Sequence, residues 1–573
     1  MSKEQGSESA VSRSQSIKED EMAKEKEASK KLSRREFVKG AAVGGAGVAA
    51  AGMLASCAPA ATPAPGETAA PAATCPPAGE CAPCAVPGVP ETWDKEADVV
   101  VVGYGGAGAC AAIESFGAGA KVLVLEKMSV GGGTTVVSGG GWVAPSDIDV
   151  AITYYQDMLS TADVSDEMIE IYVREMFDNP QFMLDLGATE DNVLDRGPIP
   201  QYPGLPGSDA IHKYYVLGPL REAENLFKVF DDYVKANDIE VMYSTPAKEL
   251  VTNGDKEVIG VIAESGTQKI AIKANRAVIL TTGGFEFNEE MLRNFVHSQP
   301  YLTTAAPGNT GDGITMAVKV GAALWHMPWP LGPYLGPAYP DLPNSQMRAS
   351  MPTDAMIVVD KYAQRVIDET NRGPHNMLWH GGIMGFRADS DGLIEFPAIP
   401  CYYIFDETSR AKGPVVSDGG YVALNLYAWS SDNTAEIEKG WIVRGDTIKD
   451  LGTNIGFDPT ALEDTVNQYN EYCLSQNDLD FERDPESLVP IMEPPYYAME
   501  VWPGFLCTEG GPKRNHKAQV LDPWDNPIPR LYSAGELGAI VGFLYQGSGD
   551  IGGDCIAFGR IAGRNAAAEE PWA

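Results

Sequence analysis

The segment from Ala97 to Glu126 constrains the fold more than any other part of the chain. It combines an apolar run at 97–102, a Gly-x-Gly-x-x-Gly turn at 103–108, an alanine-rich stretch, and a second apolar run that ends in an acid. The three glycines permit a tight turn, a close approach of backbone to a pyrophosphate, and close packing of a helix on the first strand. A helix beginning near Gly106 offers N–H groups and a positive dipole to phosphate, and Glu126 stands where a carboxylate accepts hydrogen bonds from ribose. The segment therefore predicts a strand–turn–helix–strand unit that binds a dinucleotide.

A second glycine-rich run follows directly, at residues 131–141. A unit that binds a nicotinamide dinucleotide normally continues into another helix at this point. Glycine-rich backbone instead suits close contact with a flat ring system. Near the C-terminus, residues 529–536 form a short apolar strand ending in Ala-Gly-Glu, which resembles the second flavin-contacting segment of flavoproteins with two dinucleotide-binding motifs. These observations predict FAD as the cofactor.

Charge and length limit the class of protein. The chain has 573 residues, enough for two or three domains, and a net charge of −36. Such a surface repels nucleic acid and anionic lipid headgroups. A strongly acidic surface favours a soluble protein. It is consistent with a basic electron-transfer partner and equally with an acidic face that only contacts solvent. We therefore expect no nucleic-acid partner.

The N-terminus is typical of a targeting segment. Arg34 and Arg35 lie in Ser-Arg-Arg-Glu-Phe-Val-Lys, which resembles the twin-arginine export signal. The apolar stretch at 40–56 is too short and too mild for a membrane span, and it ends in Leu-Ala-Ser-Cys, which resembles a bacterial lipobox. We expect export to the cell envelope or periplasm and a lipid anchor at Cys57 on the outer face of the membrane. The alternative is a plain signal with a fortuitous cysteine.

Residues 58–93 are rich in alanine and proline and predict an extended tether. The Cys-x-x-Cys pair formed by Cys81 and Cys84 lacks the following histidine of a haem-attachment motif, so we expect a disulfide in an exported linker. The cysteines beyond the linker are scattered and are expected to be buried thiols, and no metal site is predicted. They are Cys110, Cys401, Cys473, Cys507 and Cys555.

The remaining pattern predicts an α/β fold, with a Rossmann-like FAD-binding domain interrupted by an α+β cap that binds substrate. Strands are expected at 239–243, 258–263, 269–273 and 277–284, the middle two forming a hairpin and the last ending in glycines. A helix is expected to open after 309–313, and the last helix to span 555–568. The predicted domains are the signal at 1–57, the linker at 58–93, the two parts of the FAD-binding domain at 94–326 and 496–573, and the cap at 327–495.

These residues resemble the flavoproteins related to soluble fumarate reductase and 3-ketosteroid 1-dehydrogenase. The resemblance spans nearly the whole chain after the linker and rests on the fingerprint, on Gly283-Gly284-Phe285, on Gly311-Asp312-Gly313, on residues 357–360 with Arg365, and on Ala534-Gly535-Glu536. It implies that FAD exchanges a hydride between its N5 and a carbon next to an activating group. It also implies a set of cofactor contacts: Gly103, Gly105, Gly106, Ala107, Gly108, Glu126, Lys127, Gly132, Gly133, Thr134, Thr135, Ser138, Gly139, Gly140, Ala247, Thr282, Gly283, Gly284, Asp312, Gly535, Glu536, Asp550 and Ile551.

Two branches of this group differ in how they hold substrate. The fumarate reductases carry arginine and histidine in the cleft, but here Tyr545 stands at the arginine position and 505–511 contains no histidine. A dicarboxylate left unpaired in a buried cleft would cost several kcal/mol per charge, at roughly the effective desolvation penalty. The segment from Tyr545 to Gly549 instead resembles the Tyr-x-Gly-x-Gly of the steroid dehydrogenases, in which the tyrosine hydroxyl and the second glycine's N–H hold the substrate ketone.

Further catalytic candidates are His375 as a proton carrier, Tyr202 as a second cleft hydroxyl and Arg348 as a cleft cation. The resulting hypothesis is an exported oxidoreductase that interconverts CH–CH and C=C beside a carbonyl of an apolar, small-molecule substrate. Electrons would leave to a quinone or a separate cytochrome. The alternatives are a respiratory enoate reductase, like a fumarate or urocanate reductase, and an FAD-holding electron-transfer subunit without its own small substrate.

Overall fold

The structure is a computed structural model of the chain. It describes residues 88–296, 300–339, 348–349, 354–371, 382–388, 392–417, 427–542, 544–545 and 549–572. Among these residues, no helix is both long enough and apolar enough to span a bilayer. The predicted export signal, Cys57 and the linker cysteines precede residue 88 and lie outside the described residues.

The predicted dinucleotide unit is present. It consists of β1 (Lys95–Val102), α3 (Gly106–Gly117) and β2 (Val122–Leu125). The two strands are parallel, with Val99 opposite Val122 and Val102 opposite Leu125. Every residue of β2 is buried, as expected for a strand of a parallel sheet that is covered on both faces. The continuous apolar runs in the sequence are therefore explained by burial on both sides.

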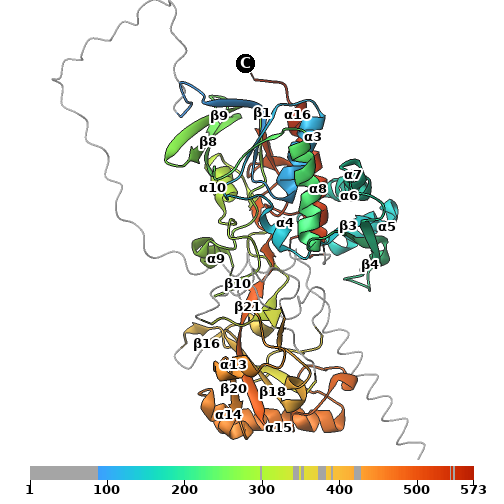
Figure 1. Ribbon diagram of the computed structural model, residues 1–573, viewed down its shortest axis with the longest axis vertical. Helices are drawn as coiled ribbons and strands as arrows, with labels where there is room; N and C mark the ends of the chain where they lie inside the picture. Colours follow the sequence, from blue (N-terminus) through green and yellow to red (C-terminus); the bar gives the residue numbers. More distant parts are fainter. Residues whose placement is uncertain are drawn as a thin grey trace, which may run out of the picture. The chain divides into compact units, whose positions relative to one another are not determined.

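This unit belongs to an eight-stranded sheet with the order β24-β25-β9-β1-β2-β6, to which β8 and β7 are added beside β9. The additional strands are β6 (Glu240–Met242), β7 (Ala247–Thr252), β8 (Val258–Ser265), β9 (Gln268–Leu280), β24 (Gln519–Leu521) and β25 (Pro527–Ser533). β9 is parallel to both β1 and β25. The C-terminal segment thus returns to the first sheet, as the Ala-Gly-Glu motif predicted (Figure 1).

Strand β9 is longer than predicted. Two separate strands were expected at 269–273 and 277–284, whereas one continuous strand spans 268–280 and ends before the glycines. Its first half pairs antiparallel with β8 in the predicted hairpin, and its second half pairs with β1. The residues between, 274–276, include neither glycine nor proline, so nothing there breaks the extended backbone.

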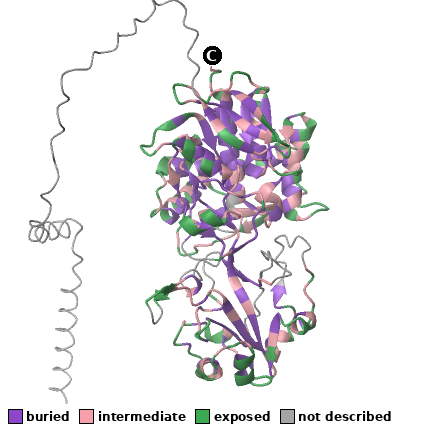
Figure 2. Ribbon diagram, turned by 90° about the vertical axis from the view of Figure 1, so that its left-hand side faces the viewer, coloured by how far each residue is buried: buried purple, intermediate pink, exposed green. Residues whose placement is uncertain are grey.

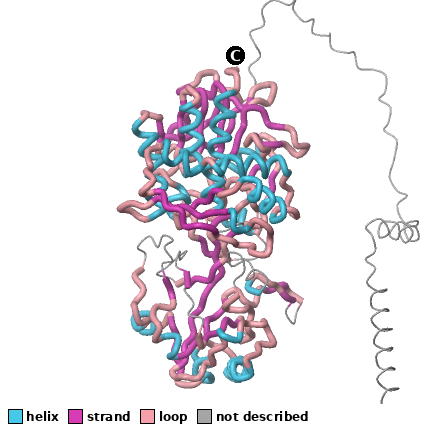
Figure 3. Tube along the Cα trace, turned by 90° about the vertical axis from the view of Figure 1, so that its right-hand side faces the viewer, coloured by secondary structure: helices cyan, strands magenta, loops and turns pink. Residues whose placement is uncertain are grey.

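Helix α16 (Asp550–Ala568) packs against α3 at the sheet (Figure 1). Figure 3 shows helices lying beside the strands. Glycines permit the close approach, because a Cβ on Gly559 would lie 2.7 Å from the carbonyl oxygen of Ala107. The helix begins at Asp550, before the predicted start at Cys555. Its first turn therefore includes residues that the sequence analysis assigned to a loop.

An additional layer between 138 and 236 was not predicted. It contains a three-stranded antiparallel sheet, β3-β5-β4, in which Lys213 is opposite Val143 and the ring of Trp142 stacks on Tyr214 with centroids 4.8 Å apart. The elements of this layer are β3 (Trp142–Pro145), α5 (Ile148–Met158), α6 (Asp166–Phe177), α7 (Asn179–Asp185), β4 (Val193–Pro198), β5 (Ile211–Val216) and α8 (Glu222–Ala236).

A second sheet of six strands has the order β10-β21-β18-β15, with β13 and β20 also paired to β21. Alternate residues of its strands enter different cores: Met356 and Val358 join one hydrophobic cluster, and Ile357 and Val359 join another. This is the period of two that a strand buried on both faces produces, and Figure 2 shows strands of both sheets largely buried. The strands are β10 (Leu302–Thr303), β13 (Tyr334–Gly336), β15 (Met356–Val359), β18 (Cys401–Asp406), β20 (Ile442–Gly445) and β21 (Tyr496–Phe505).

Strand β21 begins at the predicted limit between the cap and the second part of the FAD-binding domain. Residues from 496 onward were assigned to the FAD-binding domain, and here β21 pairs with β18 from Asp406 to Cys401 and with β20. Its last residues, Gly504 and Phe505, pair with β10. The second sheet therefore extends to residue 505, and the domain limits remain predictions.

The remaining elements are short or peripheral. They are α4 (Gly133–Val137), α9 (Glu289–Phe295), α10 (Asp312–Lys319), α12 (Glu407–Arg410), α13 (Thr434–Glu438), α14 (Ile448–Asn454), α15 (Pro459–Ser475), β11 (Leu324–Trp325), β12 (Pro330–Leu331), β14 (Arg348–Ala349), β16 (Arg387–Ala388), β17 (Ile394–Glu395), β19 (Val416–Ser417), β22 (Cys507–Thr508) and β23 (Gly511–Pro512). α10 is the helix predicted after 309–313.

Candidate active site

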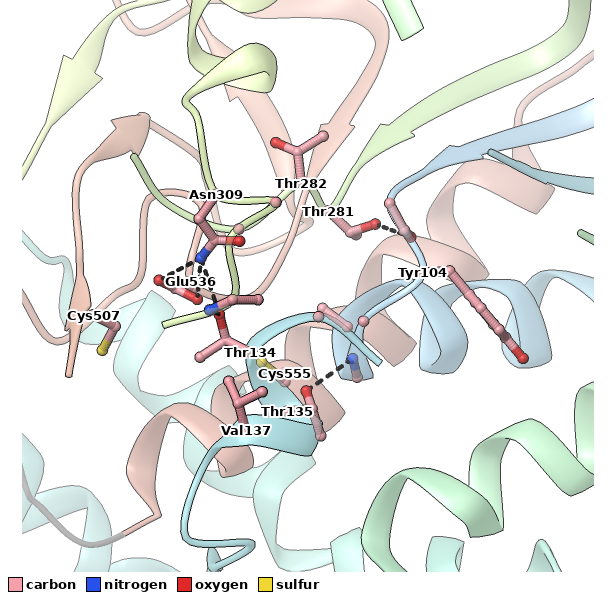
Figure 4. Close-up of a pocket in the computed structure, with 18 of the residues that line it drawn as sticks. Tyr104, Thr134, Thr135, Val137, Thr281, Thr282, Asn309, Cys507, Glu536 and Cys555 are labelled. Atoms are coloured by element: carbon pink, nitrogen blue, oxygen red, sulfur yellow. Dashed lines mark hydrogen bonds between the residues drawn. The ribbon is translucent and has the colours of Figure 1, made fainter. Parts of the chain in front are cut away.

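A cavity lies at the carboxyl ends of the parallel strands. Its wall includes Val102 and Leu125, which end β1 and β2, together with Thr281 after β9 and Ala534 after β25. The space, including its opening to solvent, is about 1540 Å³. Ligands of open α/β sheets bind outside the carboxyl ends of the strands. Figure 4 shows part of this wall.

Most residues predicted to contact the cofactor line the cavity, although they are spread from position 103 to position 536. They are Gly103, Gly105, Gly106, Ala107, Glu126, Lys127, Gly133, Thr134, Thr135, Ser138, Gly139, Ala247, Thr282, Gly283, Asp312 and Glu536.

The remaining predicted glycines lie behind the wall. These are Gly108, Gly132, Gly140, Gly284 and Gly535. A Cβ on Gly108 would overlap the carbonyl oxygen of Gly103, and a Cβ on Gly535 would lie 2.7 Å from the Cβ of Ala107. These glycines shape the wall by allowing backbone segments to pack closely, and they do not line the cavity themselves.

The fingerprint turn depends on a conformation that favours glycine. Gly103 has φ +106°, and a Cβ there would overlap the carbonyl oxygen of Thr281. The Thr281 hydroxyl donates to that turn, 2.9 Å from the Gly103 carbonyl oxygen. Helix α3 then begins without a side-chain cap, and the N–H of Gly106 donates to Thr135 Oγ1 at 3.0 Å. An uncapped helix N-terminus on a cavity wall is an anion-binding site.

Glu126 is held in place by backbone donors. Its Oε2 accepts from the N–H of Tyr104 at 2.9 Å, and its Oε1 accepts from the N–H of Met128 at 2.7 Å. Burial raises the pKa of Glu126, and these N–H donors act against that increase. The carboxylate is thus oriented on the cavity wall, where its remaining lone pairs are available to a ligand.

Lys127 and Asp312 were both predicted as cofactor contacts, and they pair with each other. Lys127 Nζ lies 2.7 Å from Asp312 Oδ2 and donates to Thr310 Oγ1 at 2.6 Å. The pair joins the segment after β2 to the first turn of α10. A polar link between these two elements closes one side of the cavity.

The two residues predicted to hold a ketone oxygen are adjacent. Tyr545 and Gly549 both line the cavity, and the N–H of Gly549 donates to Tyr545 Oη at 3.2 Å. Gly549 has φ +127°, and a Cβ there would lie 2.8 Å from the backbone of Gly141 and Trp142. The donors therefore lie against the end of the glycine-rich stretch.

Of the other predicted catalytic residues, only Tyr202 has its side chain described. Tyr202 packs beside the large hydrophobic core of the first region and does not line the cavity, because the unpredicted layer forms around its loop. His375 lies outside the described residues. The backbone of Arg348 lies in β14, and the backbones of Asp550 and Ile551 begin α16, but the side chains of all three lie outside the description.

Sequence reasoning missed several lining residues. Lys213 lies on β5 of the unpredicted layer, so no local signal marked it. Asn309 was noted only as the start of a helix, yet its Nδ2 donates to Thr134 Oγ1 at 3.0 Å and faces Glu536 (Figure 4). Cys507 and Cys555, expected to be plain buried thiols, also line the cavity. Tyr104, the second residue of the predicted fingerprint turn, also lines the cavity.

The wall has features that suit a dinucleotide. The hydroxyl of Thr282 is buried without a hydrogen-bond partner among the described residues, although Thr282 lines the cavity. Two helices, α3 and α16, begin at this wall without side-chain caps. Orphaned polar groups, helix N-termini and glycine backbone are the groups that pyrophosphate and ring contacts require. Within the described ranges, no group of three or more His, Cys, Asp or Glu residues is arranged to hold a metal ion.

Comparison with known proteins agrees with this geometry. The sequence model of a family described as an FAD binding domain matches residues 98–550. The chain is 30% identical to digoxin reductase of Eggerthella lenta, over 94% of this chain and 98% of that protein. It is 30% identical to urocanate reductase of the same species, over 84% and 77% respectively. The crystal structure of 3-ketosteroid delta1-dehydrogenase from Sterolibacterium denitrificans, in complex with 1,4-androstadiene-3,17-dione, matches with a TM-score of 0.67 and 24% identity, covering 83% of this chain and all of that one.

The fold and the cavity define a flavoprotein of the α/β class with a cap domain. The chain belongs to the family of FAD-binding flavoproteins that includes fumarate reductases and 3-oxosteroid 1-dehydrogenase. It binds FAD and is an FAD-dependent oxidoreductase acting on CH–CH groups. The predicted fold class, cofactor and family resemblance are thereby confirmed.

Proposed function

We propose that this protein is an exported oxidoreductase that interconverts CH–CH and C=C bonds beside a carbonyl group on an apolar, ketosteroid-like substrate. The observation that carries the proposal is the pair of donors on the cavity wall, the hydroxyl of Tyr545 and the N–H of Gly549, at a separation of 3.2 Å. The N–H donates to that hydroxyl in this structure, and a substrate oxygen accepting from both groups would replace this bond. A carbonyl oxygen gains negative charge when the adjacent C–H bond breaks, and donors aimed at it stabilise the transition state.

FAD, when bound, supplies the hydride acceptor or donor. We assign its pyrophosphate to the fingerprint turn and the N-terminus of α3, its ribose to Glu126, and its ring system to the glycine-rich stretch at 131–141. The close approach of Gly549 to Gly141 supports a shared end of the cavity for the ring system and the substrate oxygen. Tyr545 and Gly549 then orient the substrate, and their donors neutralise part of the charge on its oxygen.

A substrate survey of the purified holoprotein tests this proposal. Anaerobic stopped-flow mixing of the oxidised protein with saturated 3-ketosteroids, and of the reduced protein with enones, follows the flavin absorbance directly. We expect neutral ketone-conjugated compounds to react faster than unsaturated carboxylic acids. Rapid oxidation of the reduced protein by unsaturated acids alone would contradict the ketone assignment.

A reductase of an unsaturated acid is the second candidate, and Lys213 is the observation that favours it. Lys213 lines the cavity and pairs through β5 with Val143, close to Gly141 and Gly549. Its Nζ lies 4.8 Å from the ring centroid of Tyr215. An ammonium group at this end of the cavity suits a carboxylate, and the identity with urocanate reductase supports this alternative.

Lys213→Met separates the two candidates, with Lys213→Arg as the matched variant that keeps the charge. If the substrate is an acid, Lys213→Met should raise its KM strongly while Lys213→Arg retains much of the activity. If the substrate is a neutral ketone, the two variants should differ little. Arg348 and His375 remain proposals as a cation and a proton carrier, and activity of the His375→Gln protein across pH tests the latter.

Export and electron transfer are further parts of the proposal. The twin-arginine motif supports passage of a folded, FAD-loaded protein, and the lipobox supports an anchor at Cys57. Replacing Arg34 and Arg35 by lysine should leave the protein in the cytoplasm. Cys57→Ala should release it from membranes, and continued sedimentation with membranes would contradict the anchor. The external electron carrier is proposed to be a quinone or a separate cytochrome.

A further inference from the structure

Three buried carboxyl groups meet beside the FAD cavity. Glu286, Glu509 and Glu536, here called the wall carboxyls, are 3%, 0% and 6% exposed. They come from three separate segments of the chain, after β9, after β22 and after β25. Only Glu536 lines the cavity itself. Burial of an ionised carboxylate is costly unless a cation or several donors compensate its charge.

Glu286 and Glu536 approach each other across a glycine. A Cβ on Gly284 would lie 2.5 Å from Glu286 Oε1 and 2.9 Å from Glu536 Oε1. The hydroxyl of Thr508 borders the same position, so both carboxyl groups and this hydroxyl surround the bare glycine. The second oxygen of Glu286, Oε2, is buried and has no hydrogen-bond partner among the described residues. A buried carboxyl oxygen without a donor can carry a proton of this carboxyl pair.

The donors around the wall carboxyls are neutral. Glu286 Oε1 accepts from the N–H and the hydroxyl of Thr508, at 2.5 and 2.9 Å, and Glu536 accepts from Asn309 Nδ2 at 3.3 Å. The thiol of Cys507 donates to Glu509 Oε1 at 3.3 Å. Burial, followed by the charge of Glu509, raises the pKa of Cys507, so the thiol stays neutral.

The charges that act on Glu536 have its own sign. Burial, then the charge and hydrogen bond of Glu286, then the charge of Glu509, raise the pKa of Glu536 well above its usual range. Arg514 donates to the carbonyl oxygen of Gly535 at 3.2 Å, but Asp554 neutralises it through two bonds of 2.9 Å. The cavity-lining thiol of Cys555 is neutral as well, because burial raises its pKa.

We propose that Glu536 and Glu286 share one proton on the wall of the FAD cavity, and that the wall carboxyls take up a second proton from solvent when FAD is reduced. Two electrons and one proton then enter the flavin, from substrate or an external donor, and one further proton binds a wall carboxylate. The only bond that forms at the wall carboxyls is the O–H bond of this proton, and their oxidation state does not change. Carboxylates this close cannot all ionise, and the negative charge that arrives on the flavin increases their affinity for protons.

The test is a spectroelectrochemical titration of the holoprotein between about pH 6 and 8, where wild type and Glu536→Gln are compared. For a two-electron couple, each coupled proton contributes about 30 mV per pH unit to the midpoint potential. We expect the wild-type slope to exceed the Glu536→Gln slope by about this amount. Glutamine retains the size of the side chain and accepts from Asn309. Equal slopes in the two proteins would overturn the proposal.

Redox-induced infrared difference spectra give a second readout that a merely structural role would not change. The carbonyl stretch of a protonated carboxyl should appear in wild type, shift in deuterium oxide, and be lost in Glu536→Gln. Glu436→Gln is the matched control, since Glu436 is a buried cap carboxyl bonded to Tyr427 Oη at 2.7 Å, and it should leave the band unchanged.

If the Glu536→Gln protein does not retain FAD, a second variant, Glu286→Gln, tests the proposal. Glu286 does not line the cavity, so Glu286→Gln should retain FAD. The substitution removes one of the two carboxyl groups that share the proton. Its slope should also fall below that of wild type, and its infrared band should be altered. A wild-type slope and band in Glu286→Gln would overturn the proposal. These results do not depend on which substrate the enzyme uses.

Discussion

The two regions of this molecule each bury carboxyl groups, and they compensate the charge in different ways. In the cap, Glu369 is fully buried and lies 3.0 Å from Arg365 and 3.1 Å from Arg483. Its Oε1 also accepts from the N–H of Val358 at 2.9 Å. Beside the FAD cavity, Glu286 and Glu536 are almost as deeply buried, but they meet neutral donors and each other.

This difference separates a structural arrangement from one suited to chemistry. A carboxylate fixed between two guanidinium groups is part of an ion-pair network, and removing one member would leave a charge buried and unpaired. Carboxyl groups that face one another can change protonation without breaking an ion pair. The cap cluster therefore stabilises the fold, whereas the wall carboxyls respond to the charge of the flavin.

The largest expected effect is on the cap. Arg483→Met removes one partner of Glu369 and should lower the free energy of unfolding by about 3–5 kcal/mol, the usual cost of breaking a buried pair. Arg444→Met is the control, because the pair of Arg444 with Asp446 is exposed and should contribute at most about 1 kcal/mol. Urea unfolding measures both. Equal stability of the two variants would contradict the structural role of the cap cluster.

The next effect concerns an acid of the cavity wall that accepts hydrogen bonds from two backbone N–H groups. Glu126→Ala removes the proposed ribose contact and should weaken FAD retention by about 1.5–3 kcal/mol, as expected for a hydrogen bond to a charged group. Glu249→Ala, at an exposed position of β7, should retain FAD fully. Equilibrium dialysis against free FAD measures the difference. Full occupancy of Glu126→Ala would rule out this assignment.

The smallest effect is on the pH dependence of stability. The pKa of Glu536 is raised above the ordinary carboxyl value of about 4.5, so the folded protein keeps a proton that the unfolded chain releases. Stability from this group is complete below that ordinary value and is lost as pH rises through the folded-state pKa. Tm of wild type should therefore decline more steeply toward alkaline pH than Tm of Glu536→Gln, at equal saturating FAD. Parallel curves would argue that Glu536 is ionised throughout.

The sequence predicted the part of the site that is local in the chain. Strand, turn, helix and acid lie within 97–126, so their spacing alone predicted the fingerprint, and most of its residues line the cavity. Glu536 was also found, through the Ala-Gly-Glu motif. Its partners were not, since Glu286 and Glu509 carry no motif and meet Glu536 only through the packing of three distant segments.

The errors have the same physical origin. Lys213 lies in a layer whose strands pair across long loops, and its position on the wall follows from pairing with Val143 rather than from any local pattern. The pairing of β21 with β18 and β10 was not predicted either, because the sequence of β21 does not change where its partners change. Short-range periodicity in the sequence predicts helices and strands, whereas the strands and side chains that each of them contacts depend on tertiary packing.

The most direct measurement of the proposed chemistry is the rate of flavin reduction in Tyr545→Phe, by single-turnover stopped flow with the best ketone substrate. Removing one donor to a developing oxyanion typically costs about 10²–10³ in rate, with FAD bound and substrate affinity little changed because the bond matters most in the transition state. Tyr532→Phe is the control, since its hydroxyl bonds to Glu569 at 2.7 Å away from the cavity, and it should react at the wild-type rate. An unchanged rate in Tyr545→Phe would contradict the carbonyl-directed mechanism.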